Sequence, residues 1–169
     1  MESYALEAER AYWDDSNHLL ILFYDEKQAK EMISGLEDHT KSLSDIKDMD
    51  SDSFAYWYDD GSIYFGKCSS QSSSPGATPT PPASPIPGAT PTPAPTADPT
   101  VQIVDVAQLS TISDSALRNY LLADNTVEFV CKVNQNSESK KYDVDIQMKF
   151  DDEIAPEYSC GKRVYLRNQ

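Results

Sequence analysis

Four aspartates in the first part of the chain have a spacing that could bind calcium. Asp48, Asp50, Asp52 and Asp59 occupy positions 1, 3, 5 and 12 of a possible calcium loop, and Ca²⁺ favours several carboxylate oxygens at such alternating positions. However, Ser53 stands where that loop needs a glycine, and the twelfth position is aspartate instead of a bidentate glutamate. We therefore interpret the segment as a solvated acidic loop, with calcium binding as the alternative.

An aromatic set follows the aspartates and could form a binding surface. Its members are Tyr56, Trp57, Tyr58, Tyr64 and Phe65. Exposed aromatic rings can stack a sugar ring or hold a peptide, but a small domain must also use part of such a set as its core. The candidate ligand surface consists of Tyr56, Trp57, Tyr58 and Tyr64, with core packing as the alternative.

The three cysteines, Cys68, Cys131 and Cys160, form no CxxC pair and have no histidine nearby, so a zinc site is not expected. Cys131 and Cys160 lie in the same half and could form a disulfide in an exported protein. The alternative is separate buried thiols, since a free cysteine packs as a small hydrophobic residue.

No catalytic constellation stands out from the sequence. His18 and His39 are far from any nucleophile pattern, and the acidic pairs Asp14/Asp15 and Asp151/Asp152 are adjacent, so in a strand their side chains would point apart. General acid–base work needs two carboxylates that face one site. We predict a protein that is not an enzyme and that carries no metal or cofactor.

The charge is strongly negative and unevenly distributed. The formal net charge is −14, and residues 1–67 alone contain 16 acidic and 6 basic residues. Such a surface repels phosphate backbones, so nucleic acid is not expected as a partner.

No run of 18 apolar residues is present, and Met1–Trp13 is acidic with no signal-peptide pattern. The chain is then either cytoplasmic or the mature region of an exported protein.

Residues 69–100 divide the chain. They hold ten of its eleven prolines, and the sequence GATPTP occurs at Gly76–Pro81 and again at Gly88–Pro93. Proline lacks the backbone donor that helices and sheets need, and these small side chains build no core. We predict a disordered linker at 69–100 between two small domains at 1–68 and 101–169. Tethers of this composition favour the exported alternative.

The first domain is predicted as a small (α)βαββ sandwich in an α+β protein. Met1–Trp13 suggests a short helix, and the apolar run at 17–24 a strand covered on both faces. Asp25 begins a helix over 26–43, and Asp59–Asp60–Gly61 joins two aromatic-rich strands as a hairpin.

The second domain is predicted as mainly antiparallel β structure with one short helix. A lead-in strand over 101–106 precedes a helix within 109–122. Alternating residues then indicate strands at 126–134 and 142–150, and a last strand at 161–166.

Both parts resemble patterns of bacterial surface proteins. Residues 17–67, with DEKQAKEMISGL after a strand and an aromatic hairpin that ends in YFG, resemble modules of uncharacterised surface lipoproteins from Gram-positive gut bacteria. Residues 105–166, with GKRV in the last strand, resemble the OB-like domains of bacterial lipoproteins, although a clear fifth strand is missing. Neither resemblance implies a known activity.

Together these observations predict a non-enzymatic, extracytoplasmic protein with two modules that binds an unknown protein or glycan at the cell surface. The linker would present one module away from the other, with a reach of about 100 Å in an extended polyproline geometry. The alternative is a carbohydrate-binding accessory module that uses the aromatic hairpin. A third possibility is a fragment of an enzyme whose catalytic domain lies outside this chain.

Overall fold

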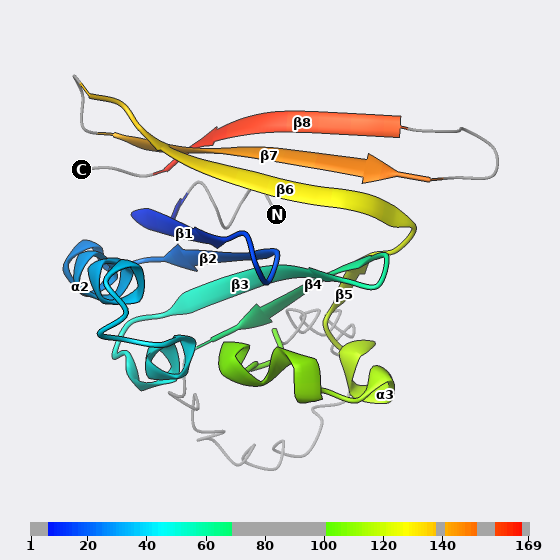
Figure 1. Cartoon of the computed structure of the whole chain (residues 1–169), viewed down its shortest axis with the longest axis horizontal. Helices are drawn as coiled ribbons and strands as arrows, with labels where there is room; N and C mark the ends of the chain where they lie inside the picture. Colours follow the sequence, from blue (N-terminus) through cyan, green and yellow to red (C-terminus); the bar gives the residue numbers. More distant parts are fainter. Residues whose placement is uncertain (1–6, 69–100, 138–140, 152–157, 167–169) are drawn as a thin grey trace, which may run out of the picture.

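The described part of the chain forms two antiparallel sheets and several short helices, an α+β arrangement rich in strands (Figure 1). The computed structural model describes residues 7–68, 101–137, 141–151 and 158–166. The first sheet has the strand order β1-β2-β3-β4-β5 and the second the order β6-β7-β8. The strands of the first sheet are β1 (Arg10–Asp14), β2 (Leu19–Phe23), β3 (Ser53–Asp59), β4 (Ser62–Lys67) and β5 (Leu121–Ala123). Those of the second are β6 (Thr126–Gln135), β7 (Tyr142–Phe150) and β8 (Tyr158–Tyr165).

The central strand β2 is buried on both faces, as its continuous apolar sequence LLILF predicts. Leu19, Ile21 and Phe23 point to one side of the first sheet, where they pack beneath the helices. Leu20 and Leu22 point to the other side, where they pack against the second sheet. The first sheet is therefore the middle of three layers, with the helices on one face and the second sheet on the other (Figure 1).

The predicted hairpin is confirmed. β3 and β4 pair antiparallel with Asp59 opposite Ser62, and the connecting residues Asp60 and Gly61 have φ of 40° and 79°. Positive φ at both central residues is the tight turn that matches the twist of two paired strands, and glycine adopts it without steric cost.

The helical layer contains α2 (Glu26–Glu37), α3 (Asp114–Leu117) and two 3₁₀ helices, η1 (Leu43–Asp48) and η2 (Val106–Thr111). Asp25 begins α2 as predicted, because its carboxylate accepts from the backbone N–H of Gln28 at 2.7 Å. The prediction that this helix continues to Leu43 is wrong. Thr40 bonds the Asp38 carboxylate through both its N–H and its hydroxyl, and His39 turns the backbone left-handed with φ of 60°.

The prediction of a helix over Met1–Trp13 holds at Glu7, which is helical, and is wrong for its last four residues, because Arg10–Asp14 is strand β1. It pairs antiparallel with β2, with Tyr12 opposite Ile21. Tyr12 and Trp13 are aromatic residues that fit a pleated, half-buried surface better than a helix. Residues 1–6 of the predicted helix lie outside the described residues.

Residues 101–123 pack on the first sheet instead of beginning a separate core. Ile103 makes a parallel bridge to Lys67 where a full lead-in strand was expected. Only four residues of the predicted helix within 109–122 are α-helical, as α3, and Leu121–Ala123 joins the sheet as β5. The open edge of β4 accounts for this difference, because the N–H of Phe65 bonds the carbonyl of Tyr120 at 2.8 Å.

The second sheet follows the alternation of its sequence. β6 and β7 begin at the predicted residues, whereas β8 begins three residues earlier than predicted. The inward residues Phe129, Cys131, Val144, Ile146 and Val164 pack against the first sheet. The finer assignments, a (α)βαββ sandwich and an OB-like domain, stay predictions.

The parts on either side of residues 69–100 are in contact, which differs from the expected presentation of one module away from the other. Lys67 donates to the carbonyl of Gln102 and accepts from the N–H of Val104, both at 2.8 Å. Val104, Val106 and Leu117 complete the core beneath the helices. The predicted linker itself lies outside the described residues.

Candidate functional site

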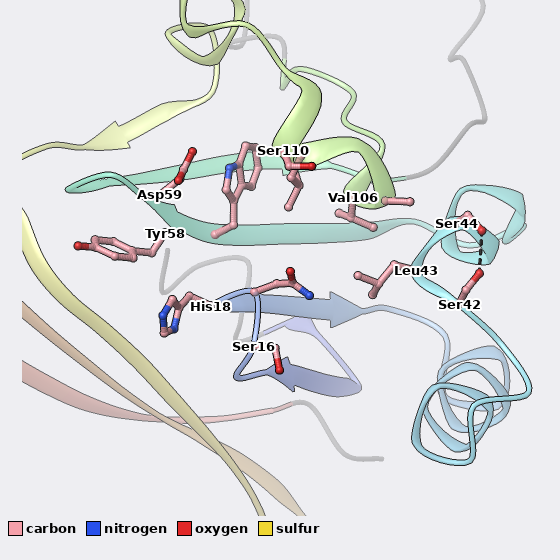
Figure 2. A pocket seen from close by; sticks show the side chains of 13 residues that line it. Ser16, His18, Ser42, Leu43, Ser44, Tyr58, Asp59, Val106 and Ser110 are labelled. Atoms are coloured by element: carbon pink, nitrogen blue, oxygen red, sulfur yellow. Dashed lines mark hydrogen bonds between the residues drawn. The ribbon is translucent and has the colours of Figure 1, made fainter.

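An open cleft of about 580 Å³ lies where the end of β3 meets the two 3₁₀ helices, and we call it the serine cleft (Figure 2). Three separate loops bring it together: the turn before β2, the start of η1 and the end of η2. Its hydrogen-bonding residues are Ser16, Asn17, His18, Ser42, Ser44, Trp57, Tyr58, Asp59 and Ser110. Asp59 is the acidic residue in this set, and the described lining contains no lysine or arginine.

Trp57 lies at the buried side of the cleft. It is 2% exposed, and its ring stacks on Tyr64 at a centroid distance of 5.5 Å and lies 5.6 Å from Tyr120. Its indole N–H donates no hydrogen bond among the described residues. This nitrogen is not among the buried side-chain atoms that lack a partner, so the N–H is accessible from the cleft.

The serine hydroxyls are held by helix capping at one wall. Ser42 precedes η1 and forms a capping box with Asp45, and its hydroxyl lies 2.7 Å from that of Ser44 (Figure 2). Capping fixes the start of η1 and so fixes where these hydroxyls point. Ser110 faces them from η2 on the other side of the cleft (Figure 2).

His18 forms a corner of the cleft in a backbone conformation that histidine seldom adopts. Its φ is 46°, and its ring centroid lies 5.9 Å from that of Tyr58 and 6.3 Å from that of Trp13. Tyr58 is fixed in turn, since its hydroxyl donates to the carbonyl of Val127 at 3.4 Å. Left-handed backbone at a non-glycine residue is often found at functional sites.

The structure does not bring the four predicted aromatic residues onto one surface. Trp57 and Tyr64 pack together beneath the helices, whereas Tyr56 and Tyr58 belong to the opposite face of the sheet. Tyr56 is buried against Phe65. Alternation along β3 separates the rings, because successive side chains of a strand point to opposite faces. Only Trp57 and Tyr58 of the predicted set line the serine cleft.

The aspartates of the acidic loop, for which calcium binding was the alternative interpretation, have other roles. Asp52 forms an ion pair with Lys67 at 2.7 Å, and Asp48 ends η1 while Asp59 ends β3. The described residues contain no group of three or more acidic, histidine or cysteine side chains that could hold a metal ion.

Of the two alternatives for Cys131 and Cys160, the disulfide is absent, and all three cysteines are free. Cys131 lies on β6 and Cys160 on β8, with β7 between them. Two strand spacings amount to about 9 to 10 Å, which exceeds the Cα separation of about 7 Å that a disulfide allows. Burial raises the pKa of the Cys68 thiol to about 12 and also raises that of Cys131.

The serine cleft was missed by the sequence reasoning, since no local motif connects Ser16, Ser42 and Ser110. Comparison of the chain with protein-family models, curated proteins and solved structures gave no match. Among the helices described, none has the length and apolar character needed to cross a membrane.

Proposed function

We propose that this chain is a non-enzymatic binding protein that acts outside the cytoplasm, and that the serine cleft is its binding site. The observation that carries the proposal is the unpaired indole N–H of Trp57, which belongs to a nearly buried residue in the lining of the cleft. This N–H is open to the cleft, where it can donate to a ligand oxygen.

The lining favours a neutral or weakly cationic ligand with several hydroxyl or carbonyl groups. Serine hydroxyls both donate and accept, and Asn17 adds an amide that also does both. Asp59 and the net charge of −14 act against anions here. The extracytoplasmic location rests on the composition of residues 69–100 and on the resemblance to surface lipoproteins.

We favour binding over catalysis because neither the serine hydroxyls of the cleft nor the buried cysteine thiols are activated as nucleophiles. Among the described residues no hydrogen bond joins His18 to a serine hydroxyl, so the serines lack the adjacent base that would activate them. The raised pKa values of Cys68 and Cys131 keep these thiols protonated at neutral pH.

A carbohydrate is the second candidate, and the hydroxyl-rich lining is the observation that favours it. The expected mode differs from the aromatic platform of the sequence analysis. Trp57 is only 2% exposed and is stacked on Tyr64, so it would contribute its N–H instead of a stacking face.

The test uses the two tryptophans of the chain as reporters. Trp57 lines the serine cleft and Trp13 does not, so the protein is labelled with ¹⁵N-tryptophan and titrated with neutral mono- and disaccharides while both indole N–H signals are followed. We expect the Trp57 signal alone to move, with a dissociation constant of about 1 mM or lower. A Trp57→Phe variant identifies the signal.

A matched pair of variants completes the design. Ser44→Ala removes a hydroxyl pair inside the cleft, whereas Ser115→Ala removes a similar hydroxyl pair with Ser113 outside it. We expect weaker binding for the first variant only. A Trp57 signal that no compound of a broader panel of neutral and cationic small molecules moves would refute the proposed site.

A further inference from the structure

A second cleft, of about 620 Å³, has the opposite electrostatic character, and we call it the arginine cleft. It lies between the edge strand β1, the helix α2 and the strands β6 and β7. The residues that carry the argument are Arg10, Trp13, Lys30, Glu37, Lys132 and Tyr142. The arginine cleft shares none of its lining residues with the serine cleft.

Arg10 is held in one position by three elements of the fold. It stands on β1, its guanidinium lies 3.9 Å from the centroid of the Tyr142 ring on β7, and it donates to Glu26 of α2 at 2.6 Å. The side chain is only 14% exposed, and its Nε is buried without a hydrogen-bond partner. A guanidinium fixed in this way is preorganised to bind an oxyanion with its remaining N–H groups.

Two further cations line the cleft from opposite walls. Lys30 belongs to α2 and Lys132 to β6, and both are exposed. Among the described residues neither lysine is part of an ion pair, and Asp145, which stands opposite Lys132 on β7, is bound by Arg163 at 2.6 Å. Glu37 is the one carboxylate in the described lining.

Taken together, the charges around the arginine cleft have the opposite sign to the net charge of the whole chain. The chain has a net charge of −14, whereas Arg10, Lys30 and Lys132 together with the two carboxylates beside them, Glu26 and Glu37, sum to one positive charge, which favours an anion locally. Trp13, on the face of β1 that packs toward the second sheet, adds an aromatic ring that can contact the carbon skeleton of a ligand.

We propose that the arginine cleft binds a small acidic molecule through its carboxylate or phosphate oxyanions. Arg10 receives one oxyanion in a fixed geometry, and Lys30 and Lys132 compensate the remaining negative charge from the two walls. The site is separate from the serine cleft, so a protein with both would hold a neutral ligand and an acidic ligand independently.

The experiment uses the full chain labelled with ¹⁵N-tryptophan, because Trp13 lines the arginine cleft as Trp57 lines the serine cleft. Citrate and glucose 6-phosphate are the probes, triethyl citrate is the uncharged control, and sodium chloride at matched ionic strength controls for screening. We expect the Trp13 signal to move with an acidic probe and to stay in place with both controls. A response to citrate alone identifies carboxylates, and a response to glucose 6-phosphate alone identifies phosphates.

Variants of the exposed lysines test the assignment without disturbing Arg10. We expect Lys30→Ala and Lys132→Ala each to weaken binding about fivefold, the effect of one unit charge at about 4 Å in water. Lys27→Ala on the same helix removes a charge outside the cleft and should leave the affinity unchanged. A Trp13 signal that no probe moves, or an affinity that both lysine variants retain, would overturn the proposal whatever the outcome at Trp57.

Discussion

The close approach of Gly66 to residues beyond the proline-rich segment gives the sharpest test of the fold. A methyl group added at Gly66 of β4 would lie 2.7 Å from Cγ1 of Val104 and 3.2 Å from Cδ1 of Tyr120. Real Cβ atoms essentially never come within 3.0 Å of another heavy atom, so Val104 must move. Gly66→Ala should therefore loosen the packing of residues 101–120 on the first sheet.

The expected magnitude comes from two opposing effects. Overpacking a well-filled core costs about 1 to 3 kcal/mol, and alanine recovers about 0.5 to 1 kcal/mol of the conformational entropy that glycine loses in a strand. We expect Gly66→Ala to lower the free energy of unfolding by about 1 to 2 kcal/mol. Gly161 on β8 is the matched control, because its added methyl would meet nothing closer than 3.7 Å.

Urea unfolding followed by tryptophan fluorescence measures both variants, with the midpoint and the slope reported separately. Val104→Ala should cost about 2 kcal/mol alone. Combined with Gly66→Ala it should cost less than the sum, because it removes the atom with which the new methyl collides. Equal midpoints for Gly66→Ala and Gly161→Ala, together with strictly additive effects of Val104→Ala, would refute the shared core.

Three further predictions follow from the same structure. Cleavage at an engineered protease site between the two GATPTP repeats should leave two fragments that elute together in gel filtration, because β4 and β5 pair and both fragments contribute to both cores; separate elution would contradict this. Asp145→Asn should destabilise the protein at pH 7 but not in acid, because the Arg163 hydrogen bonds hold the pKa of Asp145 below its usual value. The stabilisation by the ionised Asp145 is complete above about pH 4 and disappears as the pH falls through the lower pKa of the folded state. Urea midpoints of both proteins, measured between pH 7 and pH 2, test this expectation. Free-thiol titration near pH 8 should find one reactive thiol, Cys160, in the folded protein, since Cys68 and Cys131 are buried with raised pKa values; three thiols should react in denaturant, and a single one there would support the disulfide instead.

The sequence was most informative where one local pattern decides the structure. The apolar run of β2, the Asp25 cap and the Asp60–Gly61 turn each depend on residues close together in the chain, and each was predicted correctly. β6 and β7 were found for the same reason, because alternation is a property of the strand itself.

The errors arose where a distant partner decides the structure. Leu121–Ala123 has the residues of a helix end, yet β4 recruits it as a strand. The serine cleft joins three loops whose proximity depends on the whole fold, and the arginine cleft needs β1, which was predicted as a helix.

The bridge between Lys67 and Ile103 has a consequence for the evolution of the chain. It holds Lys67 and Ile103, which flank residues 69–100, next to each other. The entropy lost on closing a loop grows only with the logarithm of its length, and doubling the length costs about 0.6 kcal/mol. Gain or loss of a GATPTP repeat should therefore be nearly neutral for stability. The length and composition of residues 69–100 can therefore change under selection with little effect on the stability of the fold.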